Sequence, residues 1–97
     1  MVAMIDSFLK TTPVRLEDAR EGLLASDADR VRRALHTLGS SAGQLGAGDL
    51  AELCRDGESR AREADLTAIG PLLLRLAEEL QLVTSRLSET KKGSTRG

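Results

Sequence analysis

The chain has 97 residues, enough for one small domain with a single hydrophobic core. Hydrophobic residues make up 40% and charged residues 30%, a composition typical of a globular protein rather than of a disordered segment. Because the formal net charge is only −1, the charge balance favours neither a nucleic acid nor an anionic membrane surface as a partner. Phe8 is the only aromatic residue, and the remaining apolar residues are mostly leucine and alanine, which favours helices over a β-sandwich.

A single cysteine, Cys54, cannot form a disulfide within the chain, which fits the reducing cytoplasm. No signal peptide is visible, and no apolar run approaches the ~18 residues that cross a bilayer, so we expect a soluble chain without direct membrane insertion. We expect one helical domain over residues 1–90 and a flexible polar tail, KKGSTRG, over residues 91–97.

The first part of the chain predicts two helices with a break between them. On one face of residues 1–10 the apolar side chains are Met4, Ile5, Phe8 and Leu9. This pattern is typical of a short amphipathic helix that covers one end of a core, and Phe8 and Leu9 could also contribute to a docking patch. A threonine cap followed by Pro13 at the first helical position then begins a second helix, which ends near Leu24.

The strongest helical pattern lies between Asp27 and Gly46. Its apolar side chains recur every four or three residues and form one stripe: Val31, Leu35, Leu38, Ala42 and Leu45. At about 100° per residue, the only histidine, His36, points roughly 140° away from the centre of that stripe. The imidazole is therefore predicted to lie in solvent. Asp27 or Ser26 is expected to cap the start of this helix, and Gly46 to end it.

Small and basic residues border His36 on this helix. Gly39 and Gly43 lie on the flank between the histidine and the apolar stripe, although a glycine within a helix costs about 1 kcal/mol relative to alanine. Two explanations are open and compatible: a neighbouring helix packs closely there, or a bare surface gives another protein access to the ring. The other candidates on this surface are Arg32, Arg33, Ser40 and Gln44.

Two further helices complete the chain. One is predicted over residues 49–63, with charges that we interpret as a solvated face: Glu52, Arg55, Asp56, Glu58, Arg60, Arg62 and Glu63. The other is expected to begin after Gly70–Pro71, because proline is tolerated in a first turn but not in a helix interior, with residues 66–69 as a preceding turn or a kinked extension. The short connections predict an all-α fold: an antiparallel four-helix bundle with a short extra N-terminal helix.

The segment HTLGSSAGQLGA, which begins at His36, resembles the signature of histidine phosphotransfer (HPt) domains, His-x-Leu-Lys-Gly-Ser-Ser/Ala-x-x-Leu-Gly. The matching positions are His36, Leu38, Ser41, Ala42, Gly43, Leu45 and Gly46. Gly39 departs from the usual lysine, and Ser40 from the usual glycine. The flanking segments IDSFLKTTPVRLEDAR and LAELCRDGESRAREAD are also similar to this family, so the resemblance covers roughly residues 4–88.

The resemblance implies that His36 takes a phosphoryl group from the aspartyl phosphate of a response-regulator receiver domain and passes it to another receiver. The receiver would supply Mg²⁺, and a hybrid histidine kinase is a further expected partner. On this hypothesis Arg32 and Arg33 balance phosphate charge, although solvation alone would explain them equally well, and Gln44 contacts the partner. The family is often monomeric, so we expect a monomer.

The residues themselves exclude several kinds of chemistry. One histidine and one cysteine are too few soft ligands for a zinc site, and the chain has no P-loop or other nucleotide signature. We therefore expect no cofactor, no autokinase activity and no enzymatic turnover. An imidazole titrates at about pH 6.5, so near pH 7 it is mostly neutral and nucleophilic. The alternative to a phosphocarrier is a helical adaptor that binds a receiver or kinase without carrying phosphate, and the missing lysine at Gly39 is its best support.

Overall fold

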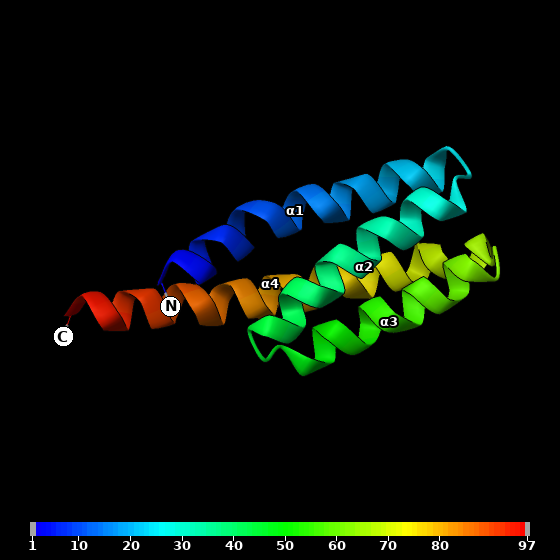
Figure 1. The fold of residues 1–97 in the computed structure, drawn as a ribbon. Helices are drawn as coiled ribbons and strands as arrows, with labels where there is room; N and C mark the ends of the chain where they lie inside the picture. Colours follow the sequence, from blue (N-terminus) through cyan, green and yellow to red (C-terminus); the bar gives the residue numbers. More distant parts are fainter. Residues whose placement is uncertain (1, 97) are drawn as a thin grey trace.

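The computed structural model describes the backbone of residues 2–96 and the side chains of residues 6–87 and Glu89. That part of the chain has no β-strand and consists of helices α1 (Val2–Leu24), α2 (Ala28–Gln44), α3 (Gly48–Arg62) and α4 (Leu66–Arg96). The helices run alternately up and down; each packs against the one before it, and α1 also packs against α4 (Figure 1). The predicted all-α antiparallel four-helix bundle is confirmed.

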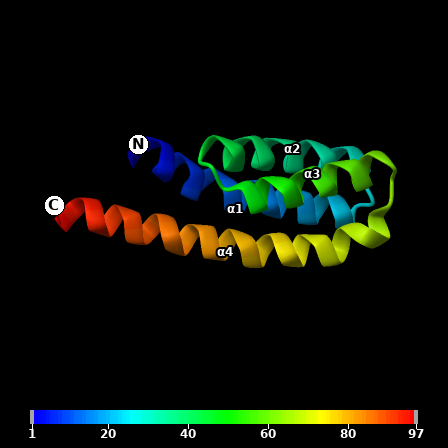
Figure 2. The ribbon, with the colours of Figure 1, turned by 90° about the horizontal axis from the view of Figure 1, so that it is seen from below.

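The bundle is a rod of 48 × 19 × 18 Å. The last turns of α4 project beyond the other three helices, at the same end as the start of α1 (Figure 2). The backbone of residues 91–96, which we predicted as a flexible tail, belongs to these turns of α4, and its flexibility stays a prediction. Within residues 2–96, no helix carries an apolar stretch of the length that a bilayer span requires.

The prediction of a separate N-terminal helix is wrong, because α1 continues through Thr12 and Pro13. The Thr12 hydroxyl donates to the carbonyl oxygen of Phe8 at 2.7 Å, a bond that a threonine makes inside a helix rather than as a cap. Phe8, Thr12 and Leu16 are all buried, so one continuous stripe holds both halves of α1 against the bundle. Pro13 lies on the exposed side, where water can reach the carbonyl group that has lost its donor.

The ends of α2 are set by local backbone chemistry. Of the two candidate caps, Asp27 is the one observed: its side chain accepts the backbone N–H of Arg30 at 3.1 Å. Gly46 has φ +76°, the left-handed conformation that a glycine adopts without strain, so it ends the helix as predicted. These two residues set the limits of α2.

α4 begins at Leu66, so the predicted start after Gly70–Pro71 is wrong. Ile69 is fully buried and Leu66 packs against the core, which holds the first turn of α4 in place before the proline. Pro71 is exposed, on the side of the helix where a lost backbone hydrogen bond is replaced by water. Residues 66–69 therefore form a helical extension rather than a separate turn.

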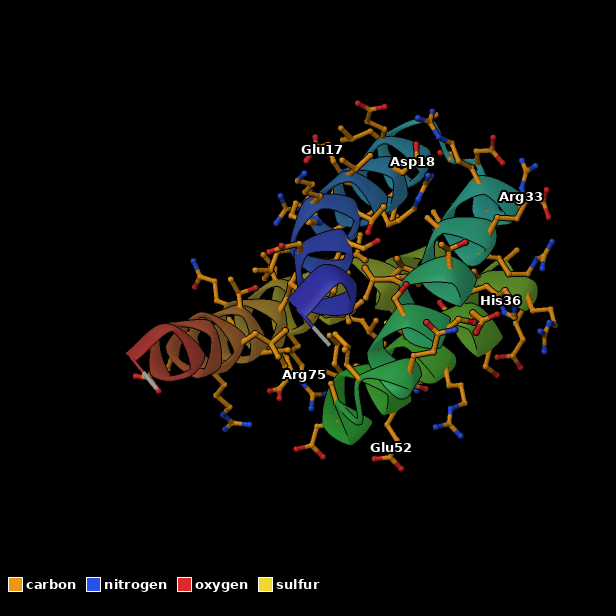
Figure 3. The ribbon with its side chains drawn as sticks, turned by 60° about the vertical axis from the view of Figure 1, so that its left-hand side comes forward. Glu17, Asp18, Arg33, His36, Glu52 and Arg75 are labelled. Carbon is orange, nitrogen blue, oxygen red and sulfur yellow. The ribbon has the colours of Figure 1, made fainter. Side chains whose placement is uncertain are left out.

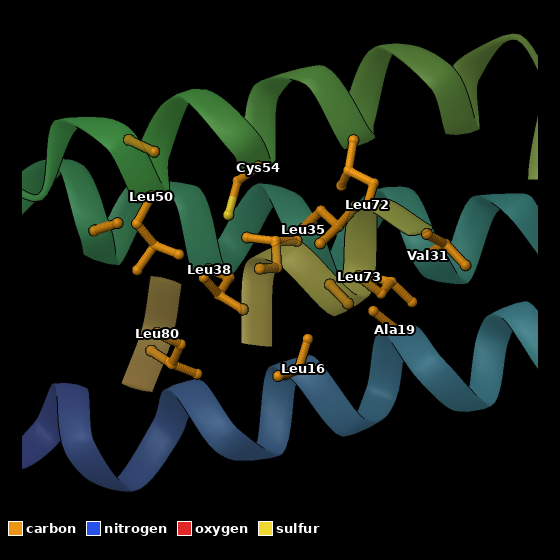
Figure 4. Close-up of a cluster of buried hydrophobic side chains, with 14 of the residues drawn as sticks. Leu16, Ala19, Val31, Leu35, Leu38, Leu50, Cys54, Leu72, Leu73 and Leu80 are labelled. Atoms are coloured by element: carbon orange, nitrogen blue, oxygen red, sulfur yellow. The ribbon is translucent and has the colours of Figure 1, made fainter. Parts of the chain in front are cut away.

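The core lies between all four helices, and α1 contributes Leu16 and Ala19 to it (Figure 4). Its largest fully buried side chains are Leu35, Leu38, Leu50, Ile69, Leu76, Val31, Thr12 and Cys54. Gly57 of α3 fits closely here, because a Cβ atom on it would lie 2.5 Å from Leu35 Cδ1 and 3.0 Å from Leu72 Cδ2. The apolar stripe of α2 is thus turned inward, with Leu45 partly buried just after the helix, and the opposite face, which carries His36, is turned outward.

Candidate functional site

The imidazole of His36 stands on the outer face of α2, where the spacing of the apolar stripe predicted it. Its side chain is 68% exposed, whereas Leu35 and Leu38 on the same helix are buried. Figure 3 shows His36 along the outer side of α2 together with Arg33. A partner protein therefore has direct access to one edge of the ring.

The other edge of the ring is held by α3. Nδ1 of His36 lies 2.9 Å from Oε1 of Glu58, whose side chain is only 11% exposed. A carboxylate offers only acceptors, so the imidazole donates its Nδ1–H and keeps the lone pair on Nε2. The bond thus selects the tautomer whose free nitrogen faces solvent, and it limits rotation of the ring.

The sequence prediction placed Glu58 on a solvated face, and this is wrong. Glu58 is nearly buried because it shares a spacing of three, four and three residues with the buried Ala51, Cys54 and Ala61. That spacing was visible in the sequence. A carboxylate on the inner stripe of a helix has to find a partner, and no other element of the sequence indicated that the partner would be His36.

The two glycines near His36 have different structural roles. A Cβ atom on Gly39 would lie 3.0 Å from Cβ of Cys54, so Gly39 allows α2 and α3 to approach each other. A Cβ atom on Gly43 would meet nothing within 4 Å, so Gly43 leaves open surface. Close packing therefore explains Gly39, and the access of another protein at Gly43 stays a prediction. The close approach at Gly39 occurs about one turn from the His36–Glu58 pair and makes that contact possible.

The thiol of Cys54 is part of this packing and takes no part in the exposed surface. Burial, with a smaller contribution from the charge of Glu58, raises the pKa of Cys54 to about 12. The group is thus a neutral thiol at physiological pH, which is neither a nucleophile nor a good metal ligand. No cluster of three or more potential metal ligands occurs among the described residues.

Arg32 and Arg33 lie one turn before His36, and both are paired with the same carboxylate. Asp29 accepts from Nη2 of Arg32 at 2.8 Å and lies 3.2 Å from Nε of Arg33. The hydrogen bond from Arg32 and the positive charges of both arginines lower the pKa of Asp29. The three side chains leave one net positive charge beside the histidine.

The remaining predicted site residues are less closely grouped around the ring. Ser40 is exposed one turn after His36, and Gln44 is exposed a further turn away, over a small hollow of about 60 Å³ between α1 and α2. Phe8 is 3% exposed and belongs to the core, and Leu9 packs against it. Of the two roles predicted for these residues, core packing is therefore the one observed.

The sequence model of the Hpt domain family matches residues 3–86. The chain belongs to the Hpt domain family. The resemblance of the segment at His36 to the HPt signature is thereby confirmed, and Hpt domains are phosphocarriers within phosphorelays rather than enzymes with a substrate turnover. No curated protein sequence matches the chain.

A solved Hpt structure has the same fold. The crystal structure of histidine-containing phosphotransfer protein B (HptB) from Pseudomonas aeruginosa PAO1 superposes with a TM-score of 0.90 at 24% sequence identity. The match covers 93% of this chain and 78% of that one. At this identity the similarity supports the helical arrangement of the Hpt domain and not the roles of individual side chains.

Proposed function

We propose that this Hpt domain carries a phosphoryl group on Nε2 of His36, taking it from the aspartyl phosphate of one receiver domain and giving it to the aspartate of another. The observation that supports this most strongly is the His36–Glu58 pair: an exposed ring whose Nδ1 is held at 2.9 Å from a nearly buried carboxylate. The free lone pair then has one direction in which to react, away from the bundle.

The transfer needs little covalent help from this chain. The lone pair of Nε2 attacks phosphorus and forms the N–P bond, while the P–O bond to the aspartate breaks and its electron pair stays on the leaving carboxylate. The Nδ1 proton remains on the ring, hydrogen-bonded to Glu58, whose negative charge balances the positive charge that the ring gains. The reverse sequence delivers the group to the second receiver. Alignment and charge stabilisation account for most of the catalysis of such transfers.

The expected partners follow from the groups that this chain supplies and those that it lacks. A receiver domain or a hybrid histidine kinase would dock over the exposed surface around His36, Ser40 and Gly43, and the receiver would supply Mg²⁺. We propose that the chain works as a monomeric carrier in the cytoplasm, without a nucleotide site, autokinase activity or cofactor of its own.

The test is transfer from phosphorylated receivers. Receivers charged with acetyl phosphate should transfer label to the wild-type chain in an acid-labile, base-stable form, and His36→Gln should take up none. Glutamine keeps an N–H donor for Glu58 and so tests the nucleophile with little change in packing. Label persisting in His36→Gln would contradict the proposal.

The adaptor alternative rested on Gly39 in place of the usual lysine. The close approach of Gly39 to Cys54 gives a packing reason for a glycine there, but it supplies no cation in place of the usual lysine. A wild-type chain that binds receivers tightly and never becomes labelled would favour the adaptor.

A further inference from the structure

A phosphoryl group on His36 would be placed in a site that already contains an anion. It would bring up to about two negative charges. The positive charge that the ring gains on phosphorylation is balanced by Glu58, 2.9 Å from Nδ1, so the ring does not offset the charge of the phosphoryl group. A stable phosphorylated state therefore needs cations near Nε2 that other carboxylates do not already neutralise.

The basic residues of α2 supply only part of this charge. Arg32 and Arg33 share the carboxylate of Asp29. Position 39, where the HPt signature has a lysine, is a glycine in this chain and supplies no charge. The additional cations have to come from another helix, and α3 is the one that meets α2 at His36.

Two arginines of α3 have the required placement. Arg55 lies three residues before Glu58 and Arg62 four residues after it, spacings at which Cβ atoms are about 5–6 Å apart. At about 100° per residue, both lie 40–60° beyond Glu58, on the side turned away from the buried Cys54. Glu58 contacts His36, so this outer side of α3 borders the exposed edge of the ring.

Both side chains are also available. Arg55 and Arg62 are exposed, and neither makes an ion pair or a side-chain hydrogen bond to any residue that the structure describes. Their neighbour Arg60 differs, since it is paired with Asp56 at 3.6 Å and with Asp65 at 3.7 Å. Arg62 has the favourable spacing for an ion pair with Glu58, but that carboxylate is directed to His36 instead.

We propose that Arg55 and Arg62 bind the phosphoryl group carried by His36, one from each side of Glu58. This inference rests on the proposed function, because it concerns the phosphorylated state of that histidine. It assigns the phosphate-binding cations to α3, whereas the sequence prediction sought them on α2. Their role is to stabilise the charge of the phosphoryl group, not to bind the receiver.

The test uses a small phosphoryl donor, so that no partner protein is involved. Phosphoramidate is reacted with the full chain, and the phosphohistidine is followed by ³¹P NMR as the pH is varied. In Arg55→Gln/Arg62→Gln we expect labelling to slow about fivefold and the ³¹P resonance to titrate at a higher pH, because the dianion has lost two nearby cations. Arg75→Gln is the control: Arg75 is an exposed arginine that lines the groove between α3 and α4 and is well apart from His36 (Figure 3).

Each outcome of this test either supports or overturns the role of Arg55 and Arg62. A double variant that matches Arg75→Gln in both rate and titration overturns the inference. Slower transfer from receivers alone, with unchanged phosphoramidate chemistry, also overturns it, because the arginines would then contact the receiver. If phosphoramidate labels the wild type with the expected arginine dependence while receivers never do, the inference stands and the proposed function fails. Circular dichroism melts verify that the variants are folded.

Discussion

The imidazole of His36 and the carboxylate of Glu58 meet across the α2–α3 interface, with Nδ1 and Oε1 2.9 Å apart. One partner is 68% exposed at its side chain and the other 11%, so the pair connects the interior of the bundle to its surface. The exposed nitrogen is oriented by a residue that the reaction partner cannot reach. The first prediction tests this relationship.

Replacing Glu58 with alanine removes the acceptor of the Nδ1 proton. We expect phosphotransfer to slow about tenfold, because one hydrogen bond to a charged group is lost and the ring is free to change tautomer and rotate. Nitrogen-15 NMR of the imidazole should show a smaller fraction of the Nδ1–H tautomer. Glu52→Ala, at an exposed glutamate of the same helix, is the control (Figure 3). A tautomer ratio that is unchanged in Glu58→Ala would show that the carboxylate does not orient the ring.

Gly39→Ala and Gly43→Ala form a matched pair on one helix. Alanine at Gly43 enters open space and should raise the free energy of unfolding by up to about 1 kcal/mol through helix propensity alone. Alanine at Gly39 gains the same propensity but pushes against Cys54 Cβ, so its free energy of unfolding should be lower than that of the Gly43 variant by about 1–3 kcal/mol. Urea titrations measure both. Equal effects would contradict close packing at Gly39.

Gly39→Lys restores the lysine whose absence is the main departure from the HPt signature. A lysine there would add a cation near His36, from which the signature alone predicts faster transfer. The contact with Cys54 predicts a simultaneous loss of stability. Transfer rates of this variant are therefore to be compared at a temperature where its melting curve shows it fully folded, and an unchanged rate under those conditions would leave the signature lysine without a role here.

The Cys54 thiol should respond to pH only through unfolding. Burial raises its pKa from 9.0 to about 12, so between these values the unfolded chain has lost the thiol proton and the folded chain retains it. The free energy of unfolding should therefore fall as the pH rises from about 9 towards 12. Denaturant titrations across this range should show the fall in the wild type, and Cys54→Ala should lack this contribution. Rapid alkylation of the folded chain at pH 8 would contradict the burial of the thiol.

The contribution of the ion pair between α1 and α2 to stability should be measurable at low pH, where it is lost. Asp18 accepts from Nη2 of Arg30 at 2.8 Å, and this hydrogen bond, opposed by some desolvation and helped by Arg15, lowers the pKa of Asp18 from 3.8. A lowered pKa in the folded state stabilises the chain above pH 3.8, and the stabilisation is lost as the pH falls below that value. Acid unfolding of Asp18→Asn should show a weaker dependence on pH in this range than the wild type. Identical acid transitions would mean that the pair contributes nothing to folding.

The sequence was sufficient to predict the features of α2 that depend only on bonds and spacings within that helix. The spacing from Val31 to Leu45 determines the inner face of α2 and hence the exposure of His36, because the geometry of a helix relates every residue to its neighbours. Asp27 and Gly46 end that helix through bonds and dihedral angles within a few residues. Pro13 and Pro71 lie inside helices and do not begin them as predicted, since the burial of Thr12 and Ile69 on the core side outweighs the usual effect of proline.

By itself, the sequence determined that a histidine stands in solvent on the second helix of a four-helix bundle, because a helical period links each position to the next. Only the tertiary structure decided what holds that histidine. Glu58 is 22 residues away along the chain, and its contact with His36 depends on how closely α2 approaches α3 at Gly39 and Cys54. The spacing of residues within a single helix cannot predict how closely α2 approaches α3, because that approach arises from the packing of two separate helices against a shared core.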